Sequence, residues 1–317
     1  MTYQTINRDT SDKNIPITLK ETESKTWQWN CFDTHSFDIH YKVAGQGPAL
    51  VLIHGFGASS DHWRKNISEL ASAHRVYAID LIGFGQSAKP LPGQTTTPTE
   101  IAYTFETWGQ QIADFLREIV QEEAFLVGNS IGCVVSLQAA LFSPEQVKGL
   151  ILLDCALRQI HDRKLHTQPP LRRIGRPLLK KLVANKAIVH WLFQKLATPK
   201  AVKKILQAAY GNPNTVTDEL VELLIEPAQT PGAADVFWAF INNFTGPLPE
   251  DLLPQISCPV YIAWGTADPW EPIEQGRALV RFPSVKEFVA LEGVGHCPQD
   301  EVPEQVNGMI RDWVRQA

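Results

Sequence analysis

A serine between two glycines is the first feature of this sequence with a chemical meaning. Ser130 lies in the run Gly128-Asn-Ser-Ile-Gly132, after the short apolar run 124–127 and before the helical pattern 133–142. A strand, a sharp turn and a helix are the context of a nucleophile elbow, in which the turn holds the serine in a strained conformation and exposes its hydroxyl. We therefore predict that Ser130 is a nucleophile.

A serine hydroxyl is a poor nucleophile unless a base takes its proton and an acid orients that base. His296 lies in the Gly-rich run 293–300, directly after the last predicted strand, and Asp268 follows the strand before it. Both loops should lie at the carboxyl edge of a parallel sheet, and the chain order Ser, Asp, His is the one expected of α/β hydrolases. The sequence thus predicts a triad of Ser130, His296 and Asp268, with Asp154 as the alternative acid.

Attack on a carbonyl also needs backbone N–H groups that stabilise the oxyanion of the tetrahedral intermediate, and these come from two separate turns. The run His54-Gly-Phe-Gly57 follows the predicted strand 49–53, where one of these turns is expected. We assign the two donors to the N–H groups of Phe56 and Ile131. His54 itself is interpreted as a structural residue, because the Gly-bounded loop already explains its position.

The sequence predicts no metal and no cofactor. Five cysteines are widely spaced and form no CxxC pair, so they indicate neither a disulfide framework nor a zinc site, and they favour a reducing compartment. The run 80–87 contains Gly-x-Gly but lacks the third glycine of a dinucleotide site, and it is interpreted as a tight turn.

The elements that must position these residues follow from the hydrophobic pattern. From about residue 33 the chain alternates short apolar runs with helical periods, which is typical of a mostly parallel sheet with helices on both faces. Residues 37–43 predict an early antiparallel strand. The other predicted strands are continuous apolar runs, as expected when both faces of a sheet are buried, at 49–53, 76–79, 124–127, 150–153, 260–263 and 287–291.

This alternation stops for about 95 residues after residue 154, and helical patterns fill the gap. A helical insertion between two strands is expected to cover the strand ends as a cap. The predicted organisation is a polar N-terminal extension at 1–32, an α/β core at 33–156 and 251–317, and a cap at 157–250. The first 30 residues contain no apolar run typical of a signal peptide, and no run in the sequence is long enough to span a membrane.

The predicted cap has an unusual charge. Residues 157–204 contain 13 Lys and Arg and one acidic residue, whereas the rest of the 317 residues contain 16 Lys and Arg and 33 Asp and Glu. The whole chain has a formal net charge of −5, which gives no reason to expect a nucleic acid partner. A basic surface in an otherwise acidic protein is instead attracted to anionic lipid headgroups. We therefore predict that the cap docks on an anionic membrane surface.

The cap also contains apolar stripes, for which packing is the simpler explanation. Ile174, Leu178 and Leu182 share one helical face, and a second stripe follows at 188–196 with Lys195 nearby. We expect these stripes to pack onto the core and the Lys and Arg side chains to face outward.

The motifs together carry a resemblance to a known family. The sequence resembles the α/β-hydrolase superfamily over residues 33–316 and, more narrowly, the chlorophyll dephytylase group of plants and cyanobacteria. Five runs carry the narrower resemblance: His54-Gly-Phe-Gly-Ala-Ser-Ser-Asp-His-Trp-Arg64, Tyr77-Ala-Ile-Asp-Leu-Ile-Gly-Phe-Gly-Gln-Ser87, Gly128-Asn-Ser-Ile-Gly132, Tyr210-Gly-Asn-Pro-Asn214 and Gly293-Val-Gly-His-Cys-Pro-Gln-Asp300. The sequence departs from many hydrolases at Cys133, where they have another glycine.

The resemblance implies a serine hydrolase that cleaves the phytyl ester of chlorophyll or pheophytin to phytol and chlorophyllide or pheophorbide. In that reaction Ser130 is the nucleophile, His296 the base and Asp268 the orienting acid. Plant members carry a chloroplast-targeting extension that this N-terminus does not obviously provide, so the resemblance favours a cyanobacterial, cytoplasmic enzyme at the periphery of the thylakoid membrane.

A flat macrocycle and a phytyl chain need a long apolar slot. Five aromatic residues lie near the loops and cap that should frame the strand ends and are expected to contribute to this slot: Phe56, Trp63, Trp238, Phe240 and Trp270.

Two other functions remain open at this point. One is an esterase or lipase for another long-chain hydrophobic ester, and the other is a hydrolase-fold protein that binds a hydrophobic ligand with little turnover. A serine nucleophile argues against haloalkane dehalogenases and epoxide hydrolases, whose reactions pass through an alkyl ester of an aspartate. Motifs alone do not divide the remaining reactions.

Overall fold

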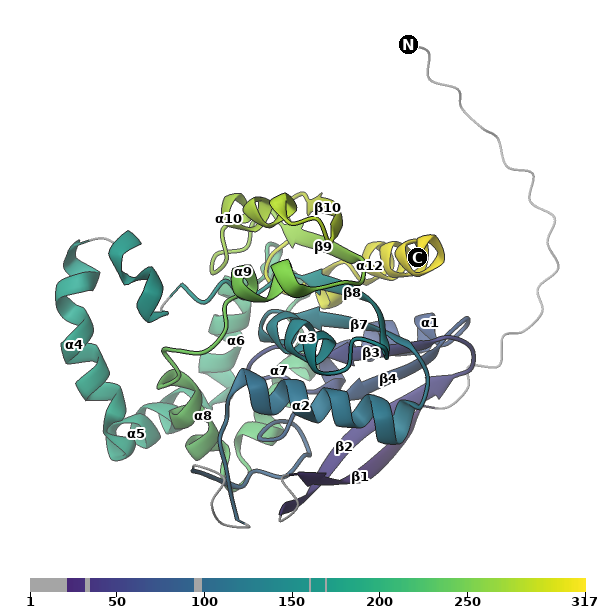
Figure 1. Ribbon diagram of the computed structural model, residues 1–317. Helices are drawn as coiled ribbons and strands as arrows, with labels where there is room; N and C mark the ends of the chain where they lie inside the picture. The colour runs from purple at the N-terminus through teal and green to yellow at the C-terminus, as the bar shows by residue number, and fades with distance from the viewer. Residues whose placement is uncertain (1–21, 32–34, 94–98, 160, 169) are drawn as a thin grey trace.

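A twisted central sheet organises the computed structural model, which describes residues 22–31, 35–93, 99–159, 161–168 and 170–317. Within these residues the sheet has eight strands in the order β1-β2-β4-β3-β7-β8-β9-β10 (Figure 1). Their bounds are β1 Glu23–Cys31, β2 His35–Gly45, β3 Ala49–Ile53, β4 Arg75–Ile79, β7 Ala124–Asn129, β8 Val147–Leu153, β9 Val260–Gly265 and β10 Val285–Leu291. β2 pairs antiparallel with β1 and β4, and the other neighbours are parallel. The predicted α/β architecture with a mostly parallel sheet is confirmed.

The sheet begins before the core boundary that the sequence predicted at residue 33. β1 pairs with β2 along its whole length, and Trp27, Trp29 and Cys31 in its second half are buried. The indole N–H of Trp29 donates a hydrogen bond of 2.8 Å to the Asp114 carboxylate on a covering helix. The predicted N-terminal extension therefore contains a strand of the core, and its residues 1–21 lie outside the described part of the chain.

Helices cover both faces of the sheet. On one face α2 (Phe105–Phe115) packs against α3 (Ile131–Phe142), and on the other α1 (Arg64–Leu70) packs against α12 (Pro303–Gln316). Consecutive residues of β3 alternate between the two apolar cores that result. Burial on both faces explains why the strand sequences are continuous apolar runs rather than alternating ones.

Short elements complete the connections. β5 (Leu91–Pro92) and β6 (Glu100–Ile101) form a small separate sheet. The short helical turns outside the insertion are η1 Ser60–Trp63, η2 Leu116–Val120, α9 Pro249–Leu252, η5 Leu253–Gln255, α10 Ile273–Arg277, η6 Ala278–Arg281 and α11 Pro298–Glu301.

Helices also fill the chain between β8 and α9, and we call α4 to α8 the cap helices. The elements of this insertion are η3 Asp162–Thr167, α4 Pro170–Ala184, α5 Lys186–Leu196, α6 Pro199–Ala209, η4 Pro213–Thr215, α7 Asp218–Ala228 and α8 Ala233–Ile241. α6 and α7 bury an apolar cluster together with Ala58 and Cys297, which belong to loops that follow β3 and β10. This cluster holds the cap helices over the carboxyl edge of the sheet.

The expectation that the apolar stripe of α4 packs onto the core is wrong. Ile174 and Leu178 are 79% and 72% exposed, and Leu182 is exposed as well. Arg176 is buried instead, with its guanidinium 4.1 Å from the centroid of the Phe244 ring. Periodicity identifies the apolar face of a helix, but whether another element covers that face depends on long-range packing that the pattern does not contain.

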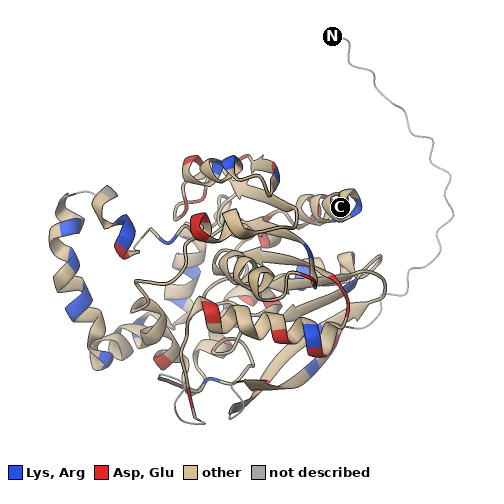
Figure 2. Cartoon of the chain, viewed as in Figure 1, with Lys and Arg blue, Asp and Glu red and all other residues tan. Residues whose placement is uncertain are grey.

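Charge is divided in space as it is in the sequence. Figure 2 shows Lys and Arg residues spaced along α4, at the left of the view, and α4 contains no acidic residue. Among the described residues, no helix has both the length and the apolar character needed to cross a membrane.

Candidate active site

The turn between β7 and α3 holds Ser130 at φ 56° and ψ −118°, a conformation that residues other than glycine rarely adopt. Both flanking glycines are needed for space. A Cβ atom on Gly128 would lie 2.5 Å from the backbone of Gly132, and a Cβ atom on Gly132 would lie 2.4 Å from the carbonyl oxygen of Ile53. The sequence Gly-x-Ser-x-Gly therefore allows a turn that places Ser130 at the carboxyl edge of β7.

His296 and Asp268 are in direct contact. The Nδ1 atom of His296 lies 2.6 Å from Oδ2 of Asp268, whose side chain is fully buried. The other carboxylate oxygen of Asp268 accepts hydrogen bonds from the N–H groups of Trp270 (2.8 Å) and Glu271 (3.1 Å). Because a carboxylate only accepts, Nδ1 of His296 carries the proton and Nε2 is the basic nitrogen. His296 and Ser130 line the same cavity.

Asp154, the alternative acid, lies behind this pair. A carboxylate oxygen of Asp154 accepts the N–H of Gly265 at 2.9 Å, and one ligand atom each of Asp154, Asp268 and His296 lie within 4.8 Å of one another. Burial, and then the neighbouring Asp268 carboxylate, raise the pKa of Asp154 well above its usual value. The geometry therefore favours Asp268 as the residue that orients His296, with Asp154 beside it.

The two predicted oxyanion donors lie in neighbouring turns. Ile53 at the end of β3 pairs with Gly128 of β7, so the loop that carries Phe56 runs beside the Ser130 turn. Ile131 is the first residue of α3, where a backbone N–H has no partner within the helix. Within the described part of the chain, neither the Phe56 nor the Ile131 N–H donates to another protein group.

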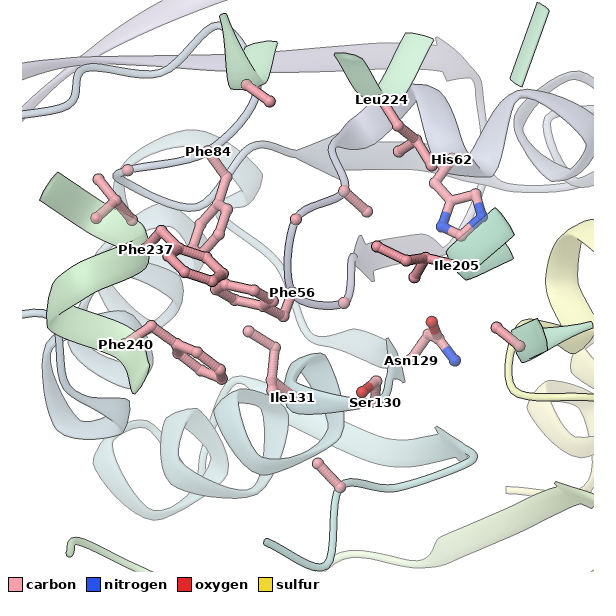
Figure 3. Close-up of a pocket in the computed structure, with 18 of the residues that line it drawn as sticks. Phe56, His62, Phe84, Asn129, Ser130, Ile131, Ile205, Leu224, Phe237 and Phe240 are labelled. Atoms are coloured by element: carbon pink, nitrogen blue, oxygen red, sulfur yellow. The ribbon is translucent and has the colours of Figure 1, made fainter. Parts of the chain in front are cut away.

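A cavity of about 520 Å³ opens beside Ser130. Figure 3 shows its walls on the two sides of the serine, which are formed by Phe56, Phe84, Phe237 and Phe240 on one side and by His62, Ile205 and Leu224 on the other. The rings of Phe56 and Phe240 stack at 3.9 Å, so an element of the core and a cap helix share one wall. A cavity with mostly apolar walls and few polar groups is suited to a hydrophobic chain.

Three of the five aromatic residues predicted for this slot line the cavity: Phe56, Phe240 and Trp270. The Trp270 ring contacts the His296 ring edge to face at 4.9 Å. The structure does not place the other two there. Trp63 is fully buried in the core under α1 and α12, and the indole N–H of Trp238 points to the Ala184 carbonyl of α4. On α8, neighbouring residues point about 100° apart, so Phe237 and Trp238 face different surroundings.

Sequence reasoning missed His62, a buried residue of the cavity wall. Its Nε2 lies 3.1 Å from the hydroxyl of Tyr210, which in turn lies 2.9 Å from a carboxylate oxygen of Asp300. The Tyr210 hydroxyl donates to the carboxylate and so accepts from His62, which leaves Nδ1 of His62 as an acceptor with no partner among the described residues. Burial lowers the pKa of His62 to about 4, so the ring is neutral at pH 7.

Residues 50–309, which are most of the chain, match the family model described as "alpha/beta hydrolase family". This chain belongs to the α/β hydrolase family. The chloroplastic pheophytinase of Arabidopsis thaliana is 27% identical over 310 residues, which cover 87% of this chain and 64% of the plant protein. The pimeloyl-[acyl-carrier protein] methyl ester esterase of Vibrio campbellii is 25% identical over 270 residues, which cover 83% of this chain and 93% of that protein.

Among solved structures, a bacterial membrane phospholipase A aligns with a TM-score of 0.69 and 27% identity, over 93% of this chain and 87% of that chain. Family membership and these relatives identify the protein as a hydrolase. This chain spans less than two thirds of the length of the plant pheophytinase.

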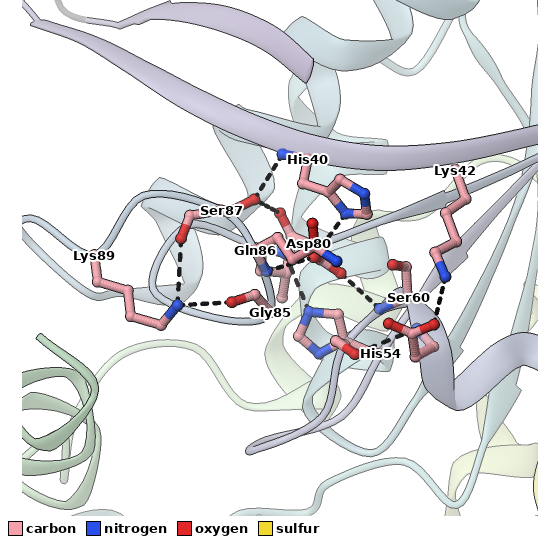
Figure 4. Close-up of polar contacts among 12 residues, drawn as sticks. His40, Lys42, His54, Ser60, Asp80, Gly85, Gln86, Ser87 and Lys89 are labelled. Carbon is pink, nitrogen blue, oxygen red and sulfur yellow. Dashed lines mark hydrogen bonds and ion pairs between the residues drawn. The ribbon is translucent and has the colours of Figure 1, made fainter. Parts of the chain in front are cut away.

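A buried carboxylate fixes the loop that carries Phe56, the predicted oxyanion donor (Figure 4). Asp80 follows β4 and accepts the N–H groups of Ser60 at 2.6 Å and Gln86 at 2.8 Å, and it contacts Nδ1 of His40 at 2.9 Å. Burial alone would raise the pKa of Asp80, but these hydrogen bonds hold it below its usual value. The sequence signalled only a tight turn here, because buried partners at long range leave no local pattern.

The interpretation of His54 as a structural residue agrees with its contacts. Its Nδ1 lies 2.7 Å from the Gly55 carbonyl oxygen and its Nε2 accepts the N–H of Leu81 at 3.1 Å. Both ring nitrogens are thus engaged with backbone, and burial lowers the pKa of His54.

Replacement of Asp80 should destabilise the fold. We expect Asp80→Asn to lower the free energy of unfolding by about 2 to 4 kcal/mol, because the amide leaves at least one buried N–H donor without an acceptor. Denaturant unfolding of the purified proteins measures the change. The exposed Asp312→Asn is the control and should stay within about 0.5 kcal/mol of the parent. Equal effects of the two substitutions would contradict the role of Asp80.

Glu271 offers a test of the electrostatics beside the cavity. Burial raises the pKa of Glu271 to about 7, with a further contribution from the Asp268 carboxylate. Between its unfolded pKa and pH 7 the carboxyl ionises in the unfolded chain but not in the folded one, so stability falls as pH rises through this window.

We therefore expect Glu271→Gln to leave stability nearly unchanged near pH 4.5 and to raise it at pH 8, by on the order of 2 to 3 kcal/mol. Unfolding by denaturant at both pH values tests this expectation. The exposed Glu274→Gln on the same segment is the matched control and should show no such pH dependence. A Glu271→Gln effect that is the same at both pH values would rule out a raised pKa.

Proposed function

We propose that this α/β hydrolase is a serine esterase that cleaves the phytyl ester of chlorophyll or pheophytin. The observation that carries the proposal is that Ser130 and His296, the latter held by Asp268, line one apolar cavity. The similarity to the Arabidopsis pheophytinase, over 87% of this chain, supports a pigment as the substrate. We place the enzyme at the periphery of the thylakoid membrane, where it would meet such a substrate.

In the first half of the proposed reaction, the Ser130 oxygen attacks the ester carbonyl carbon while Nε2 of His296 takes the hydroxyl proton. The Asp268 carboxylate stabilises the imidazolium through the bond to Nδ1. The N–H groups of Phe56 and Ile131 donate to the oxyanion of the tetrahedral intermediate. When this intermediate collapses, the phytol oxygen leaves with the proton from His296, and the pigment acid remains as an ester of Ser130.

In the second half, His296 takes a proton from water, and the resulting hydroxide attacks the carbonyl carbon of the acyl-enzyme. The second tetrahedral intermediate uses the same two N–H donors. Its collapse returns the proton to the Ser130 oxygen and releases chlorophyllide or pheophorbide. All groups used in both halves belong to this chain, and no metal or cofactor takes part in the proposed steps.

The shape and lining of the cavity favour a long apolar group on the substrate. The stacked pair Phe56 and Phe240 and the aliphatic side chains opposite them offer contact area on both sides of the serine. The relatives that act on a pimeloyl methyl ester and on phospholipids favour a second candidate, an esterase or lipase for another long acyl chain. A hydrophobic-ligand binder with little turnover is the third, and it would have no use for the strained Ser130 turn.

The triad assignment predicts the effects of its replacements. Ser130→Ala and His296→Ala should each lower kcat by about 10³-fold or more without loss of folding, and the double variant should be no worse than the singles, because the residues act as a unit. Asp268→Asn should be severe as well. Steady-state hydrolysis of a nitrophenyl ester measures kcat, and circular dichroism checks folding. If Asp268→Asn kept a near-normal kcat and Asp154→Asn were inactive, the orienting acid would be Asp154 and not Asp268.

The substrate assignment predicts that the protein cleaves pigment esters more efficiently than short esters. The purified protein should cleave detergent-dispersed chlorophyll a or pheophytin a with kcat/KM at least about tenfold above that for a nitrophenyl butyrate, because a long apolar group gains more contact in the cavity. Chromatography of the products measures this ratio. Phe240→Ala should lower it, whereas the exposed Phe142→Ala should not. Efficient cleavage of short esters with no chlorophyllide or pheophorbide from pigment would refute the pigment as the substrate and would leave the second candidate, another esterase.

A further inference from the structure

Helix α4 exposes its apolar face to solvent, whereas a surface helix normally buries that face. Leu171, Ile174, Leu178 and Leu182 recur at spacings of three and four, which places them on one face, and all four are exposed. A surface helix normally buries such a stripe and exposes its charges. An exposed apolar stripe of this length on a described helix marks an interaction surface.

Cationic residues attach α4 to the body of the protein. Arg176 is buried against the Phe244 ring, and Lys180 lies 5.1 Å from the centroid of the same ring. Both side chains also pair with Asp162, at 3.3 Å and 2.6 Å. These contacts use the polar side of α4 as its inner side, so the outward direction of the apolar stripe is built into the fold.

Helix α5 continues the exposed surface and connects it to the cavity. Ile188, Trp191 and Leu192 face outward, and Trp191 is 60% exposed. Phe193 and Leu196 of the same helix line the cavity beside Ser130. Helix α5 therefore carries both part of the exposed surface and part of the cavity wall. Figure 1 shows α4 and α5 at the edge of the molecule.

We propose that this surface docks on an anionic lipid bilayer and brings the cavity to a membrane-held ester. We call it the docking surface, and its apolar members are Leu171, Ile174, Leu178, Leu182, Ile188, Trp191 and Leu192. The purpose of docking rests on the proposed function, whereas the binding itself does not. The apolar side chains enter the interface between headgroups and acyl chains, and the exposed Lys181 and Lys195 contact lipid phosphates.

The positive charge of the docking surface favours an anionic bilayer over a second copy of the chain as its partner. Residues 163–217 contain no acidic residue, so two docking surfaces brought face to face would place like charges together. An anionic bilayer provides an apolar interior and negative charge in the same plane, which matches both components of the surface.

Sedimentation of the full chain with lipid vesicles tests the proposal without any turnover. The protein should bind vesicles of phosphatidylcholine with about 30% phosphatidylglycerol at least about tenfold more tightly than phosphatidylcholine alone, and the difference should shrink as salt rises from about 50 to 500 mM. Absence of binding to anionic vesicles at low salt would overturn the proposal. Equal binding to both vesicles would overturn the role of the cations.

Paired variants separate the two components. Ile174→Ser with Leu178→Ser, and Lys181→Glu with Lys195→Glu, should each weaken binding about tenfold or more. The matched controls are Leu91→Ser with Val280→Ser, and Lys148→Glu with Lys286→Glu, which change residues that are also exposed but lie outside the cap, and they should bind as the parent does. Hydrolysis of a soluble nitrophenyl ester should stay within about twofold in all four, because the cavity is unchanged.

Two further outcomes decide between explanations. A dimer that forms at micromolar concentration and is lost in the Ile174→Ser, Leu178→Ser variant would mean that a second copy covers the surface, and it would overturn the proposal. Vesicle binding together with failure to cleave any pigment in detergent would support docking and refute the proposed function alone. Cleavage of pigment in detergent without vesicle binding would do the reverse.

Discussion

The strained turn at Ser130 is the constraint on which the rest of the site depends. A backbone held at φ 56° and ψ −118° costs on the order of 1 to 3 kcal/mol and persists only where its surroundings leave no alternative. Here the two flanking glycines lie against the backbone of β3 and of α3, and both strands beside the turn are buried on both faces. The close approach of β3 that forces glycine at position 132 also brings the Phe56 loop beside the serine. Strain and site geometry therefore have one origin.

A chain of hydrogen bonds connects the cap to this edge of the sheet. His62, Tyr210 and Asp300 belong to three distant segments, and the buried Asp300 also pairs with Arg64 at 2.8 Å. These residues lie in three of the five runs that carried the narrower family resemblance. Contacts between the cap and the core therefore account for much of what these three runs have in common. Of the four residues, only His62 lines the cavity.

Features that depend on local pattern could be predicted from the sequence, and features that depend on distant partners could not. The apolar runs of the strands and the glycines around Ser130 are local, and the predicted strands and turn are present. The order of the loops along the chain also led to His296 and Asp268, which are in contact. The strand β1, the burial of Trp63 and the network of Asp80 all depend on partners far away in the sequence. The outward stripe of α4 is the clearest case, because its periodicity is that of a buried helix.

Positive and negative charges are concentrated in different parts of the molecule. The segment 157–204 carries a net charge of +12, and the remainder carries −17, so an anionic surface attracts one part of the protein and repels the other. In the proposed docking, such an arrangement would orient the molecule before any side chain enters lipid, with α4 and α5 toward the bilayer and the sheet away from it. In that orientation α5, a helix roughly 10 Å in diameter, would lie between the lipid and the cavity that its Phe193 and Leu196 line. An ester with a long apolar group would then cross that distance along apolar side chains, without full exposure to water.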